Sequence, residues 1–269
     1  MPWIHRQLML VGVLAVLAGA TTPAQRGGGF GFGWGSRDAS NVPYDGRFVF
    51  VRMSYDSGPG LAQFGRRGGE AFWAHDYPEG ERNFLEILTM VSNTPARVDR
   101  TSVLTFDDPE IFKFPVIYLV EPGYWYLTDE QVVTLRDYLV KGGFLIVDDF
   151  PRFNRDGSQA WPNFEFQMSR VFPDGRWVDL NDIPGHPIFH TFFEVDPNTV
   201  PLLYNLGGEA IFRALFEGND PGGRMQVIAN YQNDLSEYWE SSNDPMVPID
   251  ESNEAYKFGV NEFIYGVTH

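Results

Sequence analysis

The sequence predicts an α/β fold with a mostly parallel sheet, on three observations. First, short apolar segments such as 48–53 and 114–120 alternate with segments whose apolar residues recur at helical spacing. Second, the apolar segments show no polar alternation, which indicates strands covered on both faces. Third, Thr128-Asp129-Glu130-Gln131 follows one of these strands and forms a capping box, the start of a helix. Strands that alternate with helices build parallel βαβ units.

The same patterns place the remaining elements in order. Apolar residues at 84, 85, 88 and 91 predict a helix, and Lys141-Gly142-Gly143 ends the helix that begins at the capping box. A third strand is expected at 144–147. Beyond it, we expect a helix at 164–171, strands at 177–180 and 225–229, and a closing helix at 256–267, whereas 210–217 fits more than one structure.

The N-terminal residues predict an exported protein. Residues 1–24 have the layout of a secretory signal peptide, with an apolar run that is too short to span a bilayer as a helix; the alternative is an uncleaved anchor. Residues 25–46 are rich in glycine and predict a flexible linker. Residues 47–269 then form a single α/β domain. With no later membrane span after signal cleavage, we expect a secreted or periplasmic protein.

Charge and cysteine content exclude several functions. The chain of 269 residues has 36 acidic and 20 basic residues, a net charge of −16. Such a chain lacks the basic surface that binds nucleic acid or an anionic membrane. It has no cysteine, so disulfides, thiolate metal sites and a cysteine nucleophile are excluded.

Candidate site residues follow the predicted strands, because ligands of an open parallel sheet bind beyond the carboxyl ends of its strands. The long loop 54–78 adds His75 and Asp76. We expect a cleft rich in carboxylates and aromatic rings. The expected ligand-binding residues are Tyr55, Asp76, Glu121, Tyr124, Trp125, Asp148 and Asp149, and the candidates for catalysis are Asp148, Asp149, Glu121 and His75.

Asp148 and Asp149 have two interpretations. Either one of them caps the next turn by accepting backbone N–H bonds, or the pair forms an acid–base couple or a seat for a divalent cation. Asp76 similarly suits the N-cap of the helix that follows Pro78. The acids of 234–240 around Trp239 predict a solvated turn with a half-buried tryptophan, although Asp234 also follows a predicted strand.

Two further motifs have structural explanations. Asp107-Asp108-Pro109-Glu110 predicts the start of a short helical turn. His186 and His190 have the spacing of metal ligands, but no third ligand is evident nearby, and Pro187 favours His186 as a helix cap. We therefore assign no metal site and no cofactor.

Short motifs follow one another in a fixed order along residues 47–267. They are Asp76-Tyr77-Pro78, Glu81-Arg82-Asn83-Phe84, Asp107-Asp108-Pro109-Glu110, Leu127-Thr128-Asp129-Glu130, Gly142-Gly143-Phe144-Leu145 with Asp148-Asp149, Phe172-Pro173, His186-Pro187-Ile188-Phe189 and Gly259-Val260-Asn261. The ordered set resembles the bacterial family called domain of unknown function 4159. The resemblance implies a flavodoxin-like, class I glutamine amidotransferase-like fold, a three-layer sandwich.

The chain departs from true glutamine amidotransferases at their nucleophile. Those enzymes use a cysteine on a tight turn after a strand, assisted by His and Glu. The corresponding strand end here is expected to be Asp148-Asp149, and the chain has no cysteine, so glutamine hydrolysis through a thioester is unavailable. The resemblance therefore implies a fold and a cleft, and no activity.

Two functions follow. The favoured one is a noncatalytic binding or assembly module of the cell envelope, with a small polar ligand, a sugar or an envelope protein as its partner. The alternative is a hydrolase, acting on glycosides or assisted by a metal, that uses Asp148 and Asp149 with Glu121 or His75. Both require Glu121 and the aspartate pair to meet at one edge of the sheet.

Overall fold

The computed structural model describes residues 41–58, 71–155, 157–202 and 210–269. Internal contacts group residues 39–269 into one compact unit. The expected signal peptide at 1–24 and most of the linker at 25–46 lie outside the described residues. Within the described ranges, no helix combines the length and apolar character needed to cross a membrane.

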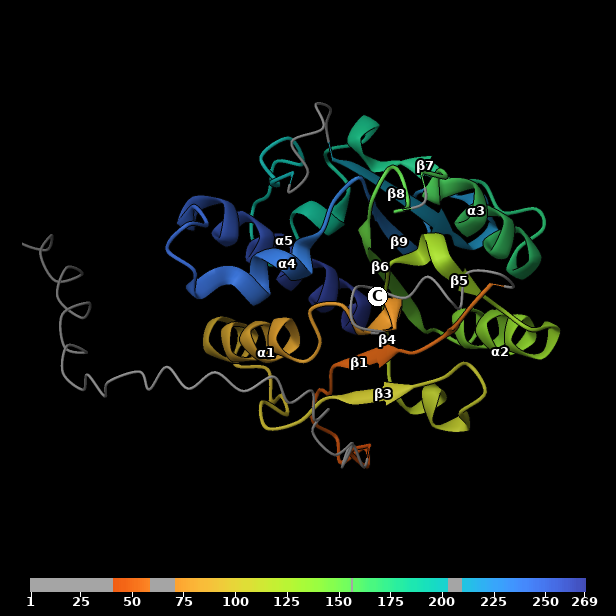
Figure 1. Cartoon of the computed structure of the whole chain (residues 1–269), viewed down its shortest axis with the longest axis horizontal. Coiled ribbons are helices and arrows are strands. Elements are labelled where there is room, and N and C mark those ends of the chain that lie inside the picture. Colours follow the sequence, from red (N-terminus) through yellow and green to blue (C-terminus); the bar gives the residue numbers. More distant parts are fainter. Residues whose placement is uncertain (1–40, 59–70, 156, 203–209) are drawn as a thin grey trace, which may run out of the picture. The chain divides into compact units, whose positions relative to one another are not determined.

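A mostly parallel sheet forms the centre of the molecule, as the sequence predicts (Figure 1). The strands β3, β1, β4, β6 and β9 lie side by side in this order and run parallel. β8 is antiparallel to β9, and β7 is antiparallel to β8. In the described residues, the bounds are β1 Val51–Met53, β3 Ser102–Leu104, β4 Val116–Val120, β6 Phe144–Phe150, β7 Val178–Asp179, β8 Ile211–Phe216 and β9 Met225–Tyr231, with β2 Asp56–Ser57 and β5 Trp125–Tyr126 forming a separate antiparallel pair.

Helices cover both faces of the sheet. Helices α1, α4 and α5 lie on one side and α2 and α3 on the other (Figure 1). Their bounds are α1 Glu79–Ser92, α2 Asp129–Val140, α3 Ala160–Val171, α4 Leu235–Glu240 and α5 Ile249–Thr268.

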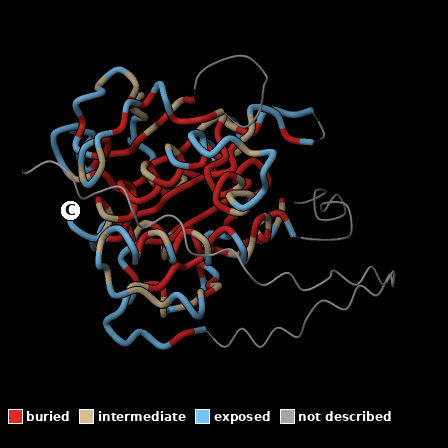
Figure 2. The backbone as a smooth tube through the Cα atoms, turned by 90° about the vertical axis from the view of Figure 1, so that its left-hand side faces the viewer, coloured by how far each residue is buried: buried red, intermediate tan, exposed pale blue. Residues whose placement is uncertain are grey.

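The central strands supply side chains to both layers. Along β4, Ile117 and Leu119 belong to the hydrophobic cluster under α2 and α3, whereas Val116, Tyr118 and Val120 belong to the cluster under α1 and α5. This alternation is the two-residue period of a strand. All five residues of β4 and all seven of β6 are buried, and the buried backbone fills the middle of Figure 2. Burial on both faces explains the unbroken apolar runs of the sequence.

Most local predictions are confirmed. The capping box is present: the Thr128 hydroxyl accepts from the Gln131 N–H at 3.2 Å, and the Gln131 side chain accepts from the Thr128 N–H at 3.0 Å. Asp108 caps the helical turn Pro109–Lys113, and His186 caps the turn Pro187–Phe189. The segment 210–217, for which the sequence fits more than one structure, contains strand β8.

Two predictions are wrong. Asp76 does not cap α1; the N-cap is Pro78, and the Asp76 side chain turns toward α4, where it accepts from the Ser236 hydroxyl. The segment 234–240 is not a solvated turn, because it contains helix α4, and both Asp234 and Trp239 are fully buried. In both places, tertiary packing places an acid in the interior where the sequence suggested a surface position.

Candidate functional site

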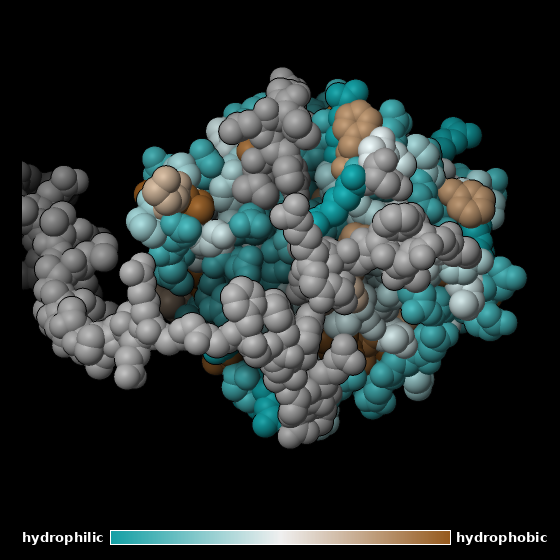
Figure 3. All heavy atoms as spheres, in the orientation of Figure 1, coloured by the Kyte–Doolittle hydropathy of each residue, from teal (hydrophilic) through white to brown (hydrophobic). Residues whose placement is uncertain are grey.

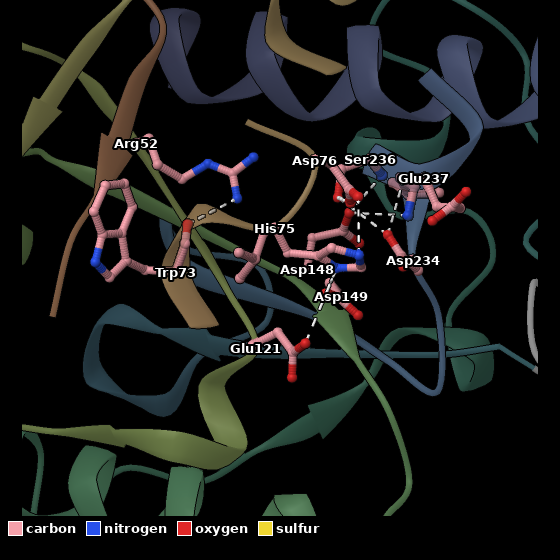
Figure 4. Close-up of polar contacts among 12 residues, drawn as sticks. Arg52, Trp73, His75, Asp76, Glu121, Asp148, Asp149, Asp234, Ser236 and Glu237 are labelled. Carbon is pink, nitrogen blue, oxygen red and sulfur yellow. Dashed lines mark hydrogen bonds and ion pairs between the residues drawn. The ribbon is translucent and has the colours of Figure 1, made fainter. Parts of the chain in front are cut away.

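The acids that follow β4 and β6 converge with His75, from the loop 54–78, at the carboxyl-terminal edge of the parallel strands (Figure 4). The backbone N–H of Glu121 donates to the carbonyl of Asp149 at 3.2 Å. His75 Nδ1 lies 2.6 Å from Asp149 Oδ2 and 4.0 Å from Glu121 Oε1. The requirement that Glu121 and Asp149 meet at one edge is therefore satisfied.

Two further acids extend this cluster on the side of α4. His75 Nε2 lies 3.1 Å from Asp76 Oδ1. Asp234, the N-cap of α4, completes a group in which His75, Asp76, Asp149 and Asp234 each offer an atom, all within 4.8 Å of one another. We call these four residues the four-residue cluster. Its His75 side chain is 15% exposed, and hydrophilic residues cover the surface between α1 and α4 in Figure 3.

Three of the acids have unusual backbone conformations. Asp76, Glu121 and Asp149 have φ angles of 61°, 50° and 43°. This left-handed region is unfavourable for residues with a Cβ atom, by about 1–2 kcal/mol per residue. Strained backbone of this kind concentrates at functional sites, where the surrounding structure holds it in place.

Hydrogen bonds to α4 connect Asp234 with Asp76. Asp234 Oδ1 accepts from the Glu237 N–H at 3.0 Å and lies 3.0 Å from the Ser236 hydroxyl. The same hydroxyl lies 3.0 Å from Asp76 Oδ2. A hydroxyl has one proton, so Ser236 can donate to only one of the two carboxylates at a time.

The cluster brings three buried carboxyl groups close together. Burial, and secondly the charge of Asp149, raise the pKa of Asp76 to about 9. Burial, followed by the charges of Asp149 and Asp76, raises the pKa of Asp234 well above its usual range. The buried guanidinium of Arg52 lowers the pKa of Asp76 only in part, because Arg52 also forms an ion pair with Glu81. The site can therefore be stabilised by taking up protons or a cation.

Asp148 lies next to Asp149 but has a different environment. Its Oδ2 accepts from the Tyr118 hydroxyl and from the N–H groups of Leu235 and Ser236, and its Oδ1 accepts from Asn230 Nδ2. The side chain is fully buried. Of the two interpretations, these bonds match the one in which the aspartate satisfies backbone N–H groups, here those at the start of α4.

The three aromatic candidates pack into the fold instead of beside His75. The Tyr55 hydroxyl donates toward the carbonyls of Val120 and Glu121, at 3.0 and 2.7 Å. The Tyr124 ring stacks on Phe72, and Trp125 is fully buried. Tyr55 thus supports the backbone at Glu121, whereas Tyr124 and Trp125 contribute to the hydrophobic core.

Sequence analysis placed Asp234 after a predicted strand but did not include it among the expected ligand-binding or catalytic residues. The available signal was its place after β9, since that strand ends at the same edge of the sheet as β4 and β6. The neighbouring acids of 234–240 suggested a solvated turn, so Asp234 was not expected in the site. Glu237 and Glu240, which together with Asp76 form a second acidic group, were hidden for the same reason.

The comparisons with known proteins agree with the resemblance seen in the sequence. A search of the curated proteins gave no match. The family model described as "Domain of unknown function (DUF4159)" matches residues 49–267, which include the sheet and every residue of the four-residue cluster. The chain therefore belongs to the DUF4159 family.

Proposed function

We propose that the chain is a hydrolase whose active site is the carboxyl edge of β4 and β6. The observation that carries this proposal is the convergence of His75, Asp149 and Glu121, with an imidazole 2.6 Å from one carboxylate and 4.0 Å from the other. Hydrolysis needs groups that take a proton from water and return it to the leaving group, and imidazole and carboxylate are the usual ones. Perturbed pKa values and strained backbone at the same place support a catalytic use.

The charge of the site favours an uncharged substrate. Asp76, Asp149, Asp234 and Glu121 lie together, and the nearby Arg52 is paired with Glu81. A phosphate group would be repelled by these carboxylates. We therefore propose esters, amides or glycosides as the substrate class.

In this proposal, Glu121 accepts the proton of the attacking water. The Glu121 carboxylate lies beside the four-residue cluster but does not belong to it. The Tyr55 hydroxyl donates to the backbone carbonyl of Glu121 at 2.7 Å. His75 and Asp149 orient the water and the substrate. Asp148, expected to participate directly, supports the site by fixing the start of α4.

A panel of uncharged esters, amides and glycosides tests the proposal, with phosphomonoesters as the comparison. The wild-type protein should turn over at least one uncharged class and no phosphomonoester. Glu121→Gln should lower kcat by about 10²-fold or more, as expected for loss of a general base. Glu194→Gln, at an exposed acid far from the site in sequence, is the matched control. No turnover by the wild-type protein on the whole panel would contradict the proposal.

A noncatalytic binding module of the cell envelope is the second candidate. It is favoured by Asp148, one of the two acids on which catalysis was expected to depend, because that side chain is committed to bonds within the fold. This function predicts that a sugar or another polar ligand raises the melting temperature without being converted. A saturating ligand at about a hundred times its Kd adds roughly 2.7 kcal/mol to the unfolding free energy.

We also propose a secreted or periplasmic location and a flavodoxin-like, class I glutamine amidotransferase-like fold. The location is supported by the signal-like residues 1–24. The fold is supported by the order of the parallel strands, which numbered along the chain is 2-1-3-4-5. In that topology, the order reverses beside β1, close to Glu121 and His75.

A further inference from the structure

We infer that His75, Asp76, Asp149 and Asp234 bind one divalent metal cation. The inference deepens the proposed hydrolase, on which it rests for the role of the cation in catalysis. The first observation is geometric: each of the four residues offers a ligand atom, and these atoms lie within 4.8 Å of one another (Figure 4). One imidazole and three carboxylates make a donor set that first-row transition metals accept.

An unsatisfied buried oxygen is the second, independent observation. Asp76 is 6% exposed, and among the described residues its Oδ1 has no hydrogen-bond partner. Leaving a buried carboxylate oxygen without a donor costs about 1–3 kcal/mol or more. A bound cation would remove this cost by coordinating the oxygen.

The contact between His75 and Asp76 has the form expected of two neighbouring ligands. Nε2 of His75 lies 3.1 Å from Asp76 Oδ1, yet the two atoms do not form a hydrogen bond. Two ligands that each lie about 2.1 Å from one ion, at right angles, are about 3 Å apart. The observed separation therefore fits two atoms that direct lone pairs at a shared ion.

The other nitrogen of His75 is placed to fix the required tautomer. Nδ1 lies 2.6 Å from Asp149 Oδ2, so a proton on Nδ1 would be shared with that oxygen, and Asp149 would bind the ion through its other oxygen, Oδ1. Nε2 is then the free base that a metal needs. Metal-binding histidines are commonly oriented by a carboxylate in this way, and the carboxylate raises their basicity.

The donor set also narrows the choice of ion. Mg²⁺ and Ca²⁺ favour sites made only of oxygen ligands, whereas imidazole suits Zn²⁺ and the three carboxylates suit Mn²⁺. Three carboxylates and a dication leave one net negative charge, a smaller imbalance than three buried carboxylates alone. We therefore infer a Zn²⁺ or Mn²⁺ site.

Within the proposed hydrolysis of an ester or amide, the cation would lower the pKa of a water molecule and polarise the substrate carbonyl. The water's O–H bond breaks and its proton passes to Glu121, while the water oxygen forms a new bond to the carbonyl carbon. The bond to the leaving oxygen or nitrogen then breaks as that atom receives the proton from Glu121. Atoms and charge balance without a further reactant.

Metal binding is tested directly on the full chain. The protein is stripped with a chelator, and Mn²⁺ is titrated while free Mn²⁺ is followed by electron paramagnetic resonance. We expect one Mn²⁺ per chain. Asp234→Asn and Asp76→Asn should each weaken binding by at least about 10-fold. Asp250→Asn, at an exposed acid in the first turn of α5, should leave binding unchanged.

A spectroscopic measurement keeps the test valid if an aspartate variant fails to fold. Electron spin echo modulation of the wild-type Mn²⁺ complex should show coupling to one imidazole nitrogen, and His75→Gln should abolish it. The inference is overturned if the wild-type protein shows no saturable binding, or if the bound ion shows no nitrogen coupling. Turnover by the metal-free protein would overturn the role of the cation in catalysis, while supporting the proposed hydrolase. Stoichiometric Mn²⁺ binding without turnover on the substrate panel would instead support the metal site and contradict the hydrolase.

Discussion

Asp148 and Asp149 are consecutive at the end of β6, yet Asp148 accepts four hydrogen bonds from within the fold, whereas Asp149 Oδ2 lies 2.6 Å from His75. Successive side chains of a strand point to opposite faces, and the left-handed conformation at Asp149 adds a further turn of the chain. One residue consequently stabilises α4, and its neighbour belongs to the site.

This division predicts effects of very different size on stability for two substitutions. Asp148→Ala should lower the unfolding free energy by about 3 kcal/mol or more, because it leaves Tyr118, Asn230 and two N–H groups without their acceptor. Asp149→Asn should change it by less than about 1 kcal/mol, since asparagine tolerates the left-handed region. Urea unfolding followed by circular dichroism measures both. Similar losses in the two variants would contradict the division.

The buried ion pair of Arg52 and Glu81 should behave as a unit. Both side chains are fully buried, so Arg52→Met leaves the Glu81 charge without its partner and should cost about 3–5 kcal/mol. Arg52→Met combined with Glu81→Leu should recover most of this loss. A double-mutant cycle from urea unfolding gives the coupling energy, and additive losses would show that the pair does not act together.

His186 should make the protein less stable in mild acid. Burial, and secondly the charge of His269, lower the pKa of His186 to about 4. Between pH 6.5 and about 4, the unfolded chain therefore binds a proton that the folded protein does not, and stability falls as the pH falls. The loss is on the order of 3 kcal/mol.

His186→Asn is the matched variant for this effect. Asparagine can still accept the N–H of Ile188, as Nδ1 of His186 does at 3.2 Å, but it does not titrate. Unfolding free energies at pH 7 and pH 4.5 should differ less in the variant than in the wild-type protein. An unchanged pH dependence would show that His186 is not the group responsible.

Gly259 allows α5 to pass close to α4. A Cβ atom at this position would lie 2.4 Å from the ring of Trp239 and 3.1 Å from that of Phe84. Gly259→Ala should therefore cost about 1–3 kcal/mol through overpacking. Gly185→Ala, where a Cβ atom meets nothing within 4 Å, is the control and should be close to neutral. Thermal unfolding of the two variants distinguishes them, and equal melting temperatures would contradict the packing argument.

The sheet could be predicted because its information is local. The apolar runs of β4 and β6 and the capping box at Thr128 depend on residues a few positions apart. The edge residues Glu121 and Asp149 could be found for a related reason, since parallel strands bring their carboxyl ends together.

The roles of individual acids could not be predicted, because distant residues decide them. Asp148 is satisfied by the N–H groups of Leu235 and Ser236, 87 and 88 positions along the chain. Asp234 has the sequence of a surface helix cap, and only the packing of α4 against α1 and α5 buries it. Tyr124 and Trp125 follow a strand, but the turn at Pro122–Tyr124 directs them into the core.

At Asp76, Glu121 and Asp149, the left-handed backbone sets thermal stability against the proposed activity. Glycine would relax the chain at each of them and delete the carboxylate in the same step. If variants were selected for heat resistance alone, glycine should therefore replace these acids one after another. The positions at which glycine accumulates would identify the carboxylates that the protein retains at a cost in stability.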